Sequence, residues 1–189
     1  MSATSRRRRG LIAVVGAALI VLTMALPASA TIIHRERYAG SDAFSYDDCG
    51  SVVDVSVEFG GLFQIRSGSG ADASAFFAHD NYWYRETHVR RSDGRTVILS
   101  GNGNFNETKA TRVEGSIFTF TAINAGQLFT ARDGDGNVIF RDRGVIVETI
   151  LFDTEGDDVP GGIFLDVLDT SFHGQFPSLD GDFCMFWTD

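Results

Sequence analysis

Hydrophobic and polar residues alternate along the segment from Ser51 to Arg66. Valine, phenylalanine or isoleucine occupies most of the odd positions, and most even positions carry polar or charged side chains. A period of two is typical of a β-strand with one buried and one exposed face. Gly60 and Gly61 interrupt the alternation, and we expect a bulge or a sharp bend there.

Six further segments have the composition of strands, being rich in β-branched and aromatic residues and bounded by turns with glycine and aspartate. They are residues 76–91, 96–105, 116–124, 127–132, 138–152 and 161–176. No window shows the 3.6-residue stripe of an amphipathic helix. The sequence therefore predicts an all-β domain of about eight antiparallel strands, arranged mostly as a meander.

Two architectures fit these strands: a closed or nearly closed β-barrel, and a two-sheet β-sandwich. The long hairpins punctuated by glycine favour the barrel. Residues 145–147 and 163–165 are apolar at successive positions, which indicates sheet faces covered on both sides. A barrel of eight strands is either filled by side chains or holds one small ligand.

The amino terminus has the three parts of a signal peptide. Arg6–Arg9 form a positive region, residues 11–26 are apolar, and Ala28-Ser29-Ala30 offers a cleavage site. The alternative, a membrane anchor, is disfavoured because the apolar run is shorter than the roughly 20 residues that span a bilayer. We expect a signal peptide over residues 1–30, one domain over residues 31–189, and a secreted, extracellular protein of bacterial type.

Cleavage would make an acidic chain more acidic. The full chain has a net charge of −9, and removal of Arg6–Arg9 raises the excess of acidic residues from 9 to 13. Such a surface repels phosphate backbones and anionic lipid. We therefore expect no nucleic-acid partner and, after cleavage, no membrane partner.

The chain has two cysteines, Cys49 and Cys184. In an exported protein an even number of cysteines predicts a disulfide. A reactive thiol is the alternative, but neither cysteine lies in a CxxC motif or beside a histidine. We expect a Cys49–Cys184 disulfide that ties the carboxyl terminus to the start of the domain.

Short strands with glycine-rich hairpins, such as residues 100–105 (SGNGNF), resemble the small β-barrels of the allene oxide cyclase and dirigent type. The resemblance is architectural and implies the barrel fold alone. It carries no catalytic residue over to this chain, and it does not indicate a function.

The segment around Tyr82, Trp83, Tyr84 and Arg85 is the leading candidate for ligand binding. Aromatic rings with polar groups suit ligand recognition, and an arginine binds anions. Alternation predicts Trp83 and Arg85 on one face of a strand, with Tyr82, Tyr84 and Glu86 on the other. The alternative is ordinary cross-strand packing of aromatic residues.

Asp133, Asp135 and Asn137 alternate with glycines and form a candidate calcium loop. The ligand set is incomplete, because position 12 of an EF-hand loop counted from Asp133 is Gly144. A hairpin turn, which favours Asp, Asn and Gly, is the alternative. A second acidic loop holds Asp153, Glu155, Asp157 and Asp158, and a long intervening strand should place the two loops at opposite ends of the domain.

Catalytic motifs are absent from the sequence. His79 and His88 lie an odd number of residues apart on one predicted strand, so they should lie on opposite faces, which disfavours a zinc site. There is no Gly-x-Ser-x-Gly motif, and we expect no cofactor. An enzyme would need His79, Asp80, Tyr84 or Glu86 to meet in one pocket.

Three functions remain open from the sequence. The leading hypothesis is a non-enzymatic barrel that binds a small-molecule ligand or a surface partner. The second is a barrel enzyme of the isomerase or cyclase kind without a recognisable motif, and the third is a structural extracellular protein with a filled core. The sequence does not predict an oligomeric state.

Overall fold

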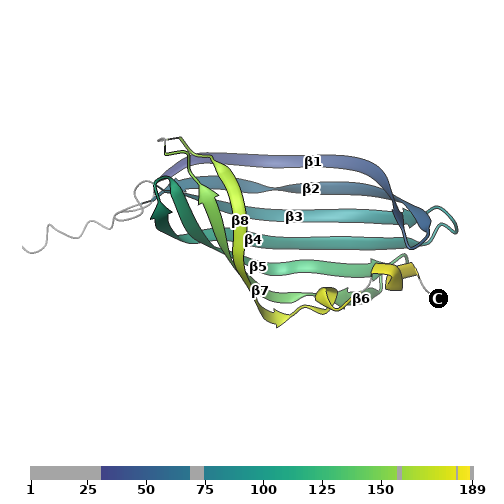
Figure 1. Cartoon of the computed structure of the whole chain (residues 1–189). Helices are drawn as coiled ribbons and strands as arrows, with labels where there is room; N and C mark the ends of the chain where they lie inside the picture. The colour runs from purple at the N-terminus through teal and green to yellow at the C-terminus, as the bar shows by residue number, and fades with distance from the viewer. Residues whose placement is uncertain (1–30, 69–74, 157–158, 182, 188–189) are drawn as a thin grey trace, which may run out of the picture.

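The computed structural model of the chain describes residues 31–68, 75–156, 159–181 and 183–187. The predicted signal peptide lies outside these residues. Eight strands form one sheet (Figure 1), and two short 3-10 helices follow them. The strands are β1 (Ile32–Asp48), β2 (Ser51–Ser67), β3 (Phe76–Arg90), β4 (Thr96–Glu114), β5 (Ile117–Asp133), β6 (Val138–Arg141), β7 (Arg143–Asp153) and β8 (Ile163–Gln175); the helices are η3 (Pro177–Leu179) and η4 (Phe183–Trp187). The prediction of an all-β domain is confirmed.

The strands pair in the order β1-β2-β3-β4-β5-β7-β8, and every pair is antiparallel. The strand β6 pairs with β5 beyond the end of β7, so β6 and β7 share one position in the sheet. The sheet is open, with β1 and β8 as its edges, and the predicted barrel closure is not confirmed. The sheet has seven strand positions, and because each strand is antiparallel to the one before it, the first strand (β1) and the last (β8) run in the same direction. The two edges could therefore close the sheet into a barrel only by pairing in parallel.

The sheet twists strongly along this path. Figure 1 shows β1 to β5 running side by side, whereas β8 runs at a steep angle to them. Strands rotate relative to their neighbours, and the rotation accumulates across an open sheet.

Asp142 separates β6 from β7, where the sequence predicted one strand over residues 138–152. Its carboxylate is buried and accepts hydrogen bonds from the backbone amide (3.1 Å) and the hydroxyl of Ser178 in η3. Its own backbone amide donates to the carbonyl of Phe129 at 2.9 Å. Because the carboxylate is used inside the domain to hold η3, the strand is interrupted at this residue.

Two other strands are longer than predicted. The strand β4 continues past residue 105 to Glu114, and β5 joins the predicted segments 116–124 and 127–132. Gly126 lies at the expected break, but it pairs with Gly103, and a Cβ at Gly126 would lie 2.6 Å from the carbonyl oxygen of Asn102. The glycine allows two strands to approach closely and does not end the strand.

One face of the sheet, which we call the core face, carries the hydrophobic cluster under η4. The cluster consists of Val53, Val55, Val97, Leu99, Ala131, Phe186 and Trp187. A second buried cluster includes Phe118 and Phe120 of β5 and Ala110 of β4. We call the opposite side of β1 to β4 the outer face.

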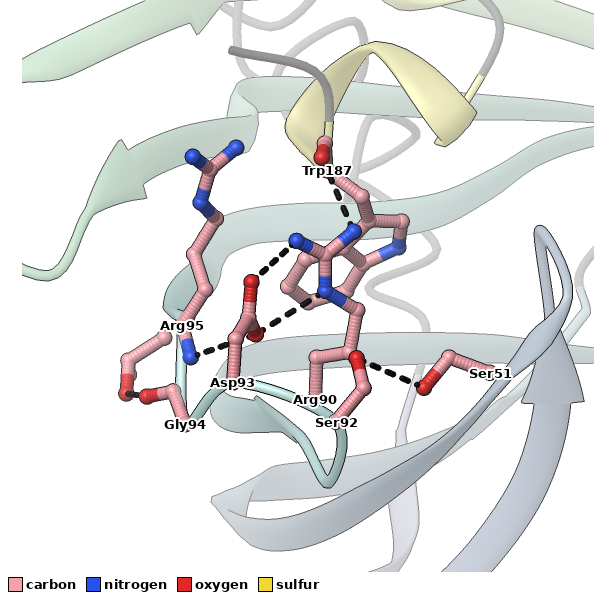
Figure 2. A network of polar contacts seen from close by, with 8 residues as sticks. Ser51, Arg90, Ser92, Asp93, Gly94, Arg95 and Trp187 are labelled. Carbon is pink, nitrogen blue, oxygen red and sulfur yellow. Dashed lines mark hydrogen bonds and ion pairs between the residues drawn. The ribbon is translucent and has the colours of Figure 1, made fainter.

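The carboxyl terminus is fixed to the core face by several contacts. Cys49 and Cys184 lie at disulfide distance, with their Cα atoms 5.5 Å apart, as predicted. The indole nitrogen of Trp187 donates to Asp48 at 2.9 Å. Figure 2 shows Arg90 donating to the backbone carbonyl of Trp187 at 2.8 Å while it also binds Asp93 in the β3–β4 turn.

The bulge predicted at Gly60 and Gly61 is wrong. The pairing of β2 with β1 and with β3 continues without a shift through both residues. A Cβ at Gly61 would lie 2.5 Å from the hydroxyl of Tyr38, and one at Gly60 would lie 3.0 Å from the indole nitrogen of Trp83. The two glycines make room for large rings on their cross-strand neighbours, one ring on each face.

The edge strand β8 differs from the prediction of a strand covered on both sides. Six of its large apolar side chains are exposed. They are Ile163, Phe164, Leu165, Val167, Leu168 and Phe172. Successive apolar residues therefore do not indicate double coverage in β8. Within the described ranges, none of the helices has the length and apolar character needed to cross a membrane.

Candidate functional site

The four residues predicted to bind ligand lie on both faces of β3. Tyr82 and Tyr84 are half-buried on the core face, whereas Trp83 and Arg85 are exposed on the outer face. This is the division that alternation predicts. The four residues therefore do not line one site.

The two tyrosines connect β3 to β5 across the intervening strand β4. The Tyr82 hydroxyl donates to the Asn124 side chain and the Tyr84 hydroxyl to the Leu128 carbonyl, each at 3.0 Å. Burial raises the pKa of the Tyr84 hydroxyl well above its ordinary value. Both hydroxyl groups remain neutral donors, and these residues have the packing role that the alternative interpretation proposed.

Trp83 forms an aromatic platform on the outer face. It pairs with Gly60 of β2, which is buried, while Trp83 itself is 46% exposed. The close approach of the indole to Gly60 shows that the ring lies over the backbone of β2. A ring supported on one side by backbone and open on the other suits stacking against a ligand.

Trp83 lies in a grid of residues from four strands, which we call the Trp83 surface. It comprises every second residue, counted from the first, of segments 35–41 of β1, 58–64 of β2, 79–85 of β3 and 100–106 of β4. We call four such residues that pair with one another across the strands a row. The row of Trp83 also contains Ala39, Gly60 and Asn102. The small residues of this row leave the indole as the most prominent side chain.

Amide groups and an imidazole form a connected network beside Trp83. The Asn104 side chain donates to the Asn81 side chain at 2.7 Å. The Nε2 of His79 lies 3.1 Å from the Nδ2 of Asn81 and 3.3 Å from that of Asn104, and its Nδ1 lies 3.3 Å from the Oδ1 of Asn106. These partners assign the imidazole proton to Nδ1. The network fixes the orientation of donors and acceptors before any ligand arrives.

Arg85 lies next to a hollow on the outer face. The hollow has a volume of about 690 Å³ and is lined by residues 41–43 of β1, residues 56–58 of β2, and Arg85 and Thr87 of β3. Glu58 is the cross-strand partner of Arg85. Among the described residues, the Arg85 side chain makes no hydrogen bond or ion pair, with Glu58 or with any other residue. Its guanidinium group is available to a ligand.

Titratable groups on the core face form two separate pairs. The Tyr38 hydroxyl donates to Asp80 at 2.7 Å, and burial together with this hydrogen bond raises the pKa of Tyr38 to about 12. The second pair joins Glu86 to the buried His88 at 2.8 Å, and His88 also contacts the Tyr46 hydroxyl at 3.2 Å.

The convergence that an enzyme would need is incomplete. Asp80, Tyr84 and Glu86 share the core face, but His79 belongs to the amide network on the outer face, as its odd separation from His88 predicted. Neither the hollow beside Arg85 nor a smaller neighbouring one is lined by any of these four residues.

The candidate calcium residues form the β5–β6 hairpin. The carboxylate of Asp133 accepts hydrogen bonds from the backbone amides of Asp135 (3.0 Å) and Asn137 (2.8 Å) and from the Asn137 side chain (2.9 Å). These donors lower the pKa of Asp133. An aspartate that accepts hydrogen bonds from the residues after it stabilises a turn, so these contacts agree with the alternative interpretation of the segment as a hairpin turn.

The second acidic loop lies at the far end of β5, as predicted, because Asp153 pairs with Ile117. Asp153 accepts the backbone amide of Glu155 at 2.8 Å, and hydrogen bonds from Ser116 and from this amide lower its pKa. Asp157 and Asp158 lie outside the described residues. In the part of the chain that the structure describes, the one clustered set of histidine, cysteine and acidic ligand atoms is Asp48, Cys49 and Cys184, where the sulfur atoms form the disulfide.

Sequence reasoning overlooked most of the Trp83 surface. The strand β1, which contributes Arg35 and Arg37, was not among the predicted strands. Asn102, Asn104 and Asn106 recur at intervals of two, and this spacing was the visible signal of a polar face. The segment was predicted as a short strand, but its glycines were used for the resemblance to small barrels and its asparagines were not interpreted.

Comparison of the chain with protein-family models, with curated proteins and with solved structures gives no match. The resemblance to allene oxide cyclase and dirigent barrels therefore stays a prediction.

Proposed function

We propose that this protein is secreted and binds a ligand or a surface partner, without catalysis, on the Trp83 surface. The observation that carries the proposal is the half-exposed indole of Trp83 supported by Gly60. A large aromatic ring held flat on a sheet and open to solvent costs little to desolvate further when a ligand covers it.

Three further features support this proposal. The amide network around His79 is preorganised, Arg85 has no partner among the described residues, and a hollow lies beside it. The Cys49–Cys184 pair is compatible with an oxidising, extracellular environment. The surface lies on the outer face, so binding there does not require the sheet to close into a barrel.

The enzyme hypothesis has less support. An acid–base mechanism needs a substrate next to the titratable groups, and Glu86 and His88 are instead directed at each other and at Tyr46. We interpret this chain of contacts as a buried network that stabilises the core face.

Native mass spectrometry of the protein recovered from the medium of a secreting host tests the proposal. We expect a mature chain that begins at Thr31 and retains a non-covalent adduct, and we expect Trp83→Ala to lose that adduct. Tyr82→Phe changes the neighbouring residue on the core face and should retain it. An adduct that persists in Trp83→Ala, or no adduct on any variant, counts against the proposal.

A further inference from the structure

We infer that the Trp83 surface binds an acidic polysaccharide, one whose sugars carry carboxylates, with a sugar ring on Trp83 and carboxylates on the surrounding arginines. This inference rests on the proposed function and names its ligand class. Three features of the surface carry it: the aromatic platform, the amide network and the distribution of charge.

The platform and the amides fit a sugar. A pyranose ring has apolar C–H faces, which stack on an indole, and a rim of hydroxyl groups that both donate and accept hydrogen bonds. Asparagine side chains also donate and accept. Asn81 and Asn104 lie in the row next to Trp83, and Asn102 lies beside it on β4. Their positions place hydrogen-bonding groups along the edge of a ring that covers the indole.

The charge of the surface fits a carboxylate. Across its four rows the charged side chains are Arg35, Arg37, Arg85 and one acid, Glu58, in a chain whose net charge is −9. All three arginines are exposed and have no side-chain partner among the described residues. Arginine binds carboxylates through two parallel hydrogen bonds. Three arginines without a side-chain partner therefore surround the platform, against the single acidic residue Glu58.

The arginines lie on both sides of Trp83. Arg85 is in the next row in one direction and Arg37 in the next row in the other, on β1. Rows are about 7 Å apart and β1 is about 10 Å from β3, from the spacing of residues and strands in a sheet. Charged groups at such separations match successive sugars of a chain better than the single carboxylate of a small acid.

A nucleic acid would need a different surface. Duplex binding depends on many phosphate contacts, and this surface offers three arginines interspersed with Glu58 in an acidic protein. A sugar chain requires fewer charges because hydroxyl groups supply much of its contact with amides.

Isothermal titration calorimetry with a hexamer of galacturonic acid tests the inference. The matched neutral probe is the methyl ester of the same hexamer, which keeps the sugar skeleton and removes the charge. We expect the acid to bind and the ester to bind at least about tenfold more weakly, and we expect added salt to weaken binding of the acid alone. Quenching of Trp83 emission should accompany binding, because the other tryptophan, Trp187, is buried.

Three variants locate the binding. Trp83→Ala should reduce affinity for the acid by about tenfold or more, and Arg85→Gln by several-fold with a weaker salt dependence. Glu58→Gln should increase affinity, because it removes the one opposing charge. Arg85→Gln and Glu58→Gln alter exposed side chains, so they test the inference even if Trp83→Ala disturbs the fold.

The outcomes separate this inference from the proposed function. Equal binding of acid and ester, lost in Trp83→Ala, overturns the acidic class and leaves the Trp83 surface as a binding site. Competition by duplex DNA or polyphosphate at equal strength, insensitive to Trp83→Ala, overturns the inference in favour of plain charge attraction. Absence of binding to either hexamer also overturns it, whereas the proposed function fails only if the native adduct is missing or survives Trp83→Ala.

Discussion

The two faces of β3 use the same residue types for different purposes. On the core face, Tyr82 and Tyr84 cover glycines of β4 and donate their hydroxyls to β5. On the outer face, Trp83 covers Gly60 in the same way, but its other side meets solvent. An aromatic residue opposite a glycine thus closes a gap in the sheet on either face, and of these three rings Trp83 is the one that is exposed.

The part of the core face around Val53, Val97 and Ala131 is covered because the carboxyl terminus is held on it. The helix η4 contributes Phe186 and Trp187 to the first cluster, and the Cys49–Cys184 pair fixes its position. No segment of the described chain covers the outer face in this way. Substitutions on the two faces should therefore differ in their cost, and the largest effect is expected where the cover of the core face is released.

Removing the disulfide should expose part of the core face. We expect the double variant Cys49→Ser, Cys184→Ser to lose about 3–5 kcal/mol of unfolding free energy, because the bridge closes a loop of 135 residues. Urea denaturation measures the loss, and a red shift of Trp187 emission reports exposure of η4. A variant with unchanged stability and unchanged emission would show that the packing of η4 does not depend on the bridge.

Truncating neighbouring rings on the two faces should have unequal effects. Tyr84→Ala removes a half-buried ring and leaves the Leu128 carbonyl without its donor, and we expect a loss of about 2–4 kcal/mol. Trp83→Ala removes a ring that is open on one side, and we expect a loss of about 1 kcal/mol or less. Denaturation of both variants under one condition makes the comparison. Equal losses would mean that Trp83 serves packing rather than binding.

The adjacent glycines extend this comparison to the backbone. Gly61→Ala places a Cβ 2.6 Å from the backbone carbonyl of Asn81 as well as against Tyr38, so we expect a loss of about 1–3 kcal/mol. Gly60→Ala meets its nearest atoms at 3.0 Å, one of them on the Trp83 ring, which is free to lift away. We expect Gly60→Ala to lose less stability than Gly61→Ala and to bind ligand more weakly. Thermal denaturation measures the stability of both variants, and calorimetry measures the binding. A larger loss of stability for Gly60→Ala than for Gly61→Ala would contradict the assignment of Trp83 to the open, outer face.

The sequence predicted the faces of the central strands better than it predicted the edges. Alternation in β2 and β3 separated Trp83 from Tyr84 correctly because both strands have one apolar cluster beneath them. Alternation did not reveal that β8 is exposed on both faces. An edge position depends on which other elements fail to pack against the strand, and the sequence of the strand alone does not show this. Gly60 was assigned to a bulge because a glycine in sequence does not show which cross-strand ring occupies the space above it.

The smallest effect is expected at Glu107, a half-buried acid. The side chain of Glu107 in β4 accepts a hydrogen bond from the backbone amide of Ala78 at 2.6 Å, and Glu107 pairs with the buried Ala122. Burial raises the pKa of Glu107 above its ordinary value of 4.5. Below that value both the folded and the unfolded chain hold the proton, so Glu107 then contributes no pH dependence.

As the pH rises through 4.5, the unfolded chain loses this proton first, so the contribution of Glu107 to stability falls until the folded carboxyl also ionises. Glu107→Gln keeps an oxygen for the Ala78 amide and removes the charge. We therefore expect the variant to have a higher melting temperature than the parent protein at pH 7 and a smaller advantage at pH 4. Glu58→Gln on the outer face is the matched control for the loss of one acidic residue. A difference in melting temperature between Glu107→Gln and the parent protein that stays constant from pH 4 to pH 7 would contradict this prediction. It would show that folding leaves the pKa of Glu107 unchanged, and therefore that water reaches this carboxyl as freely as it reaches Glu58.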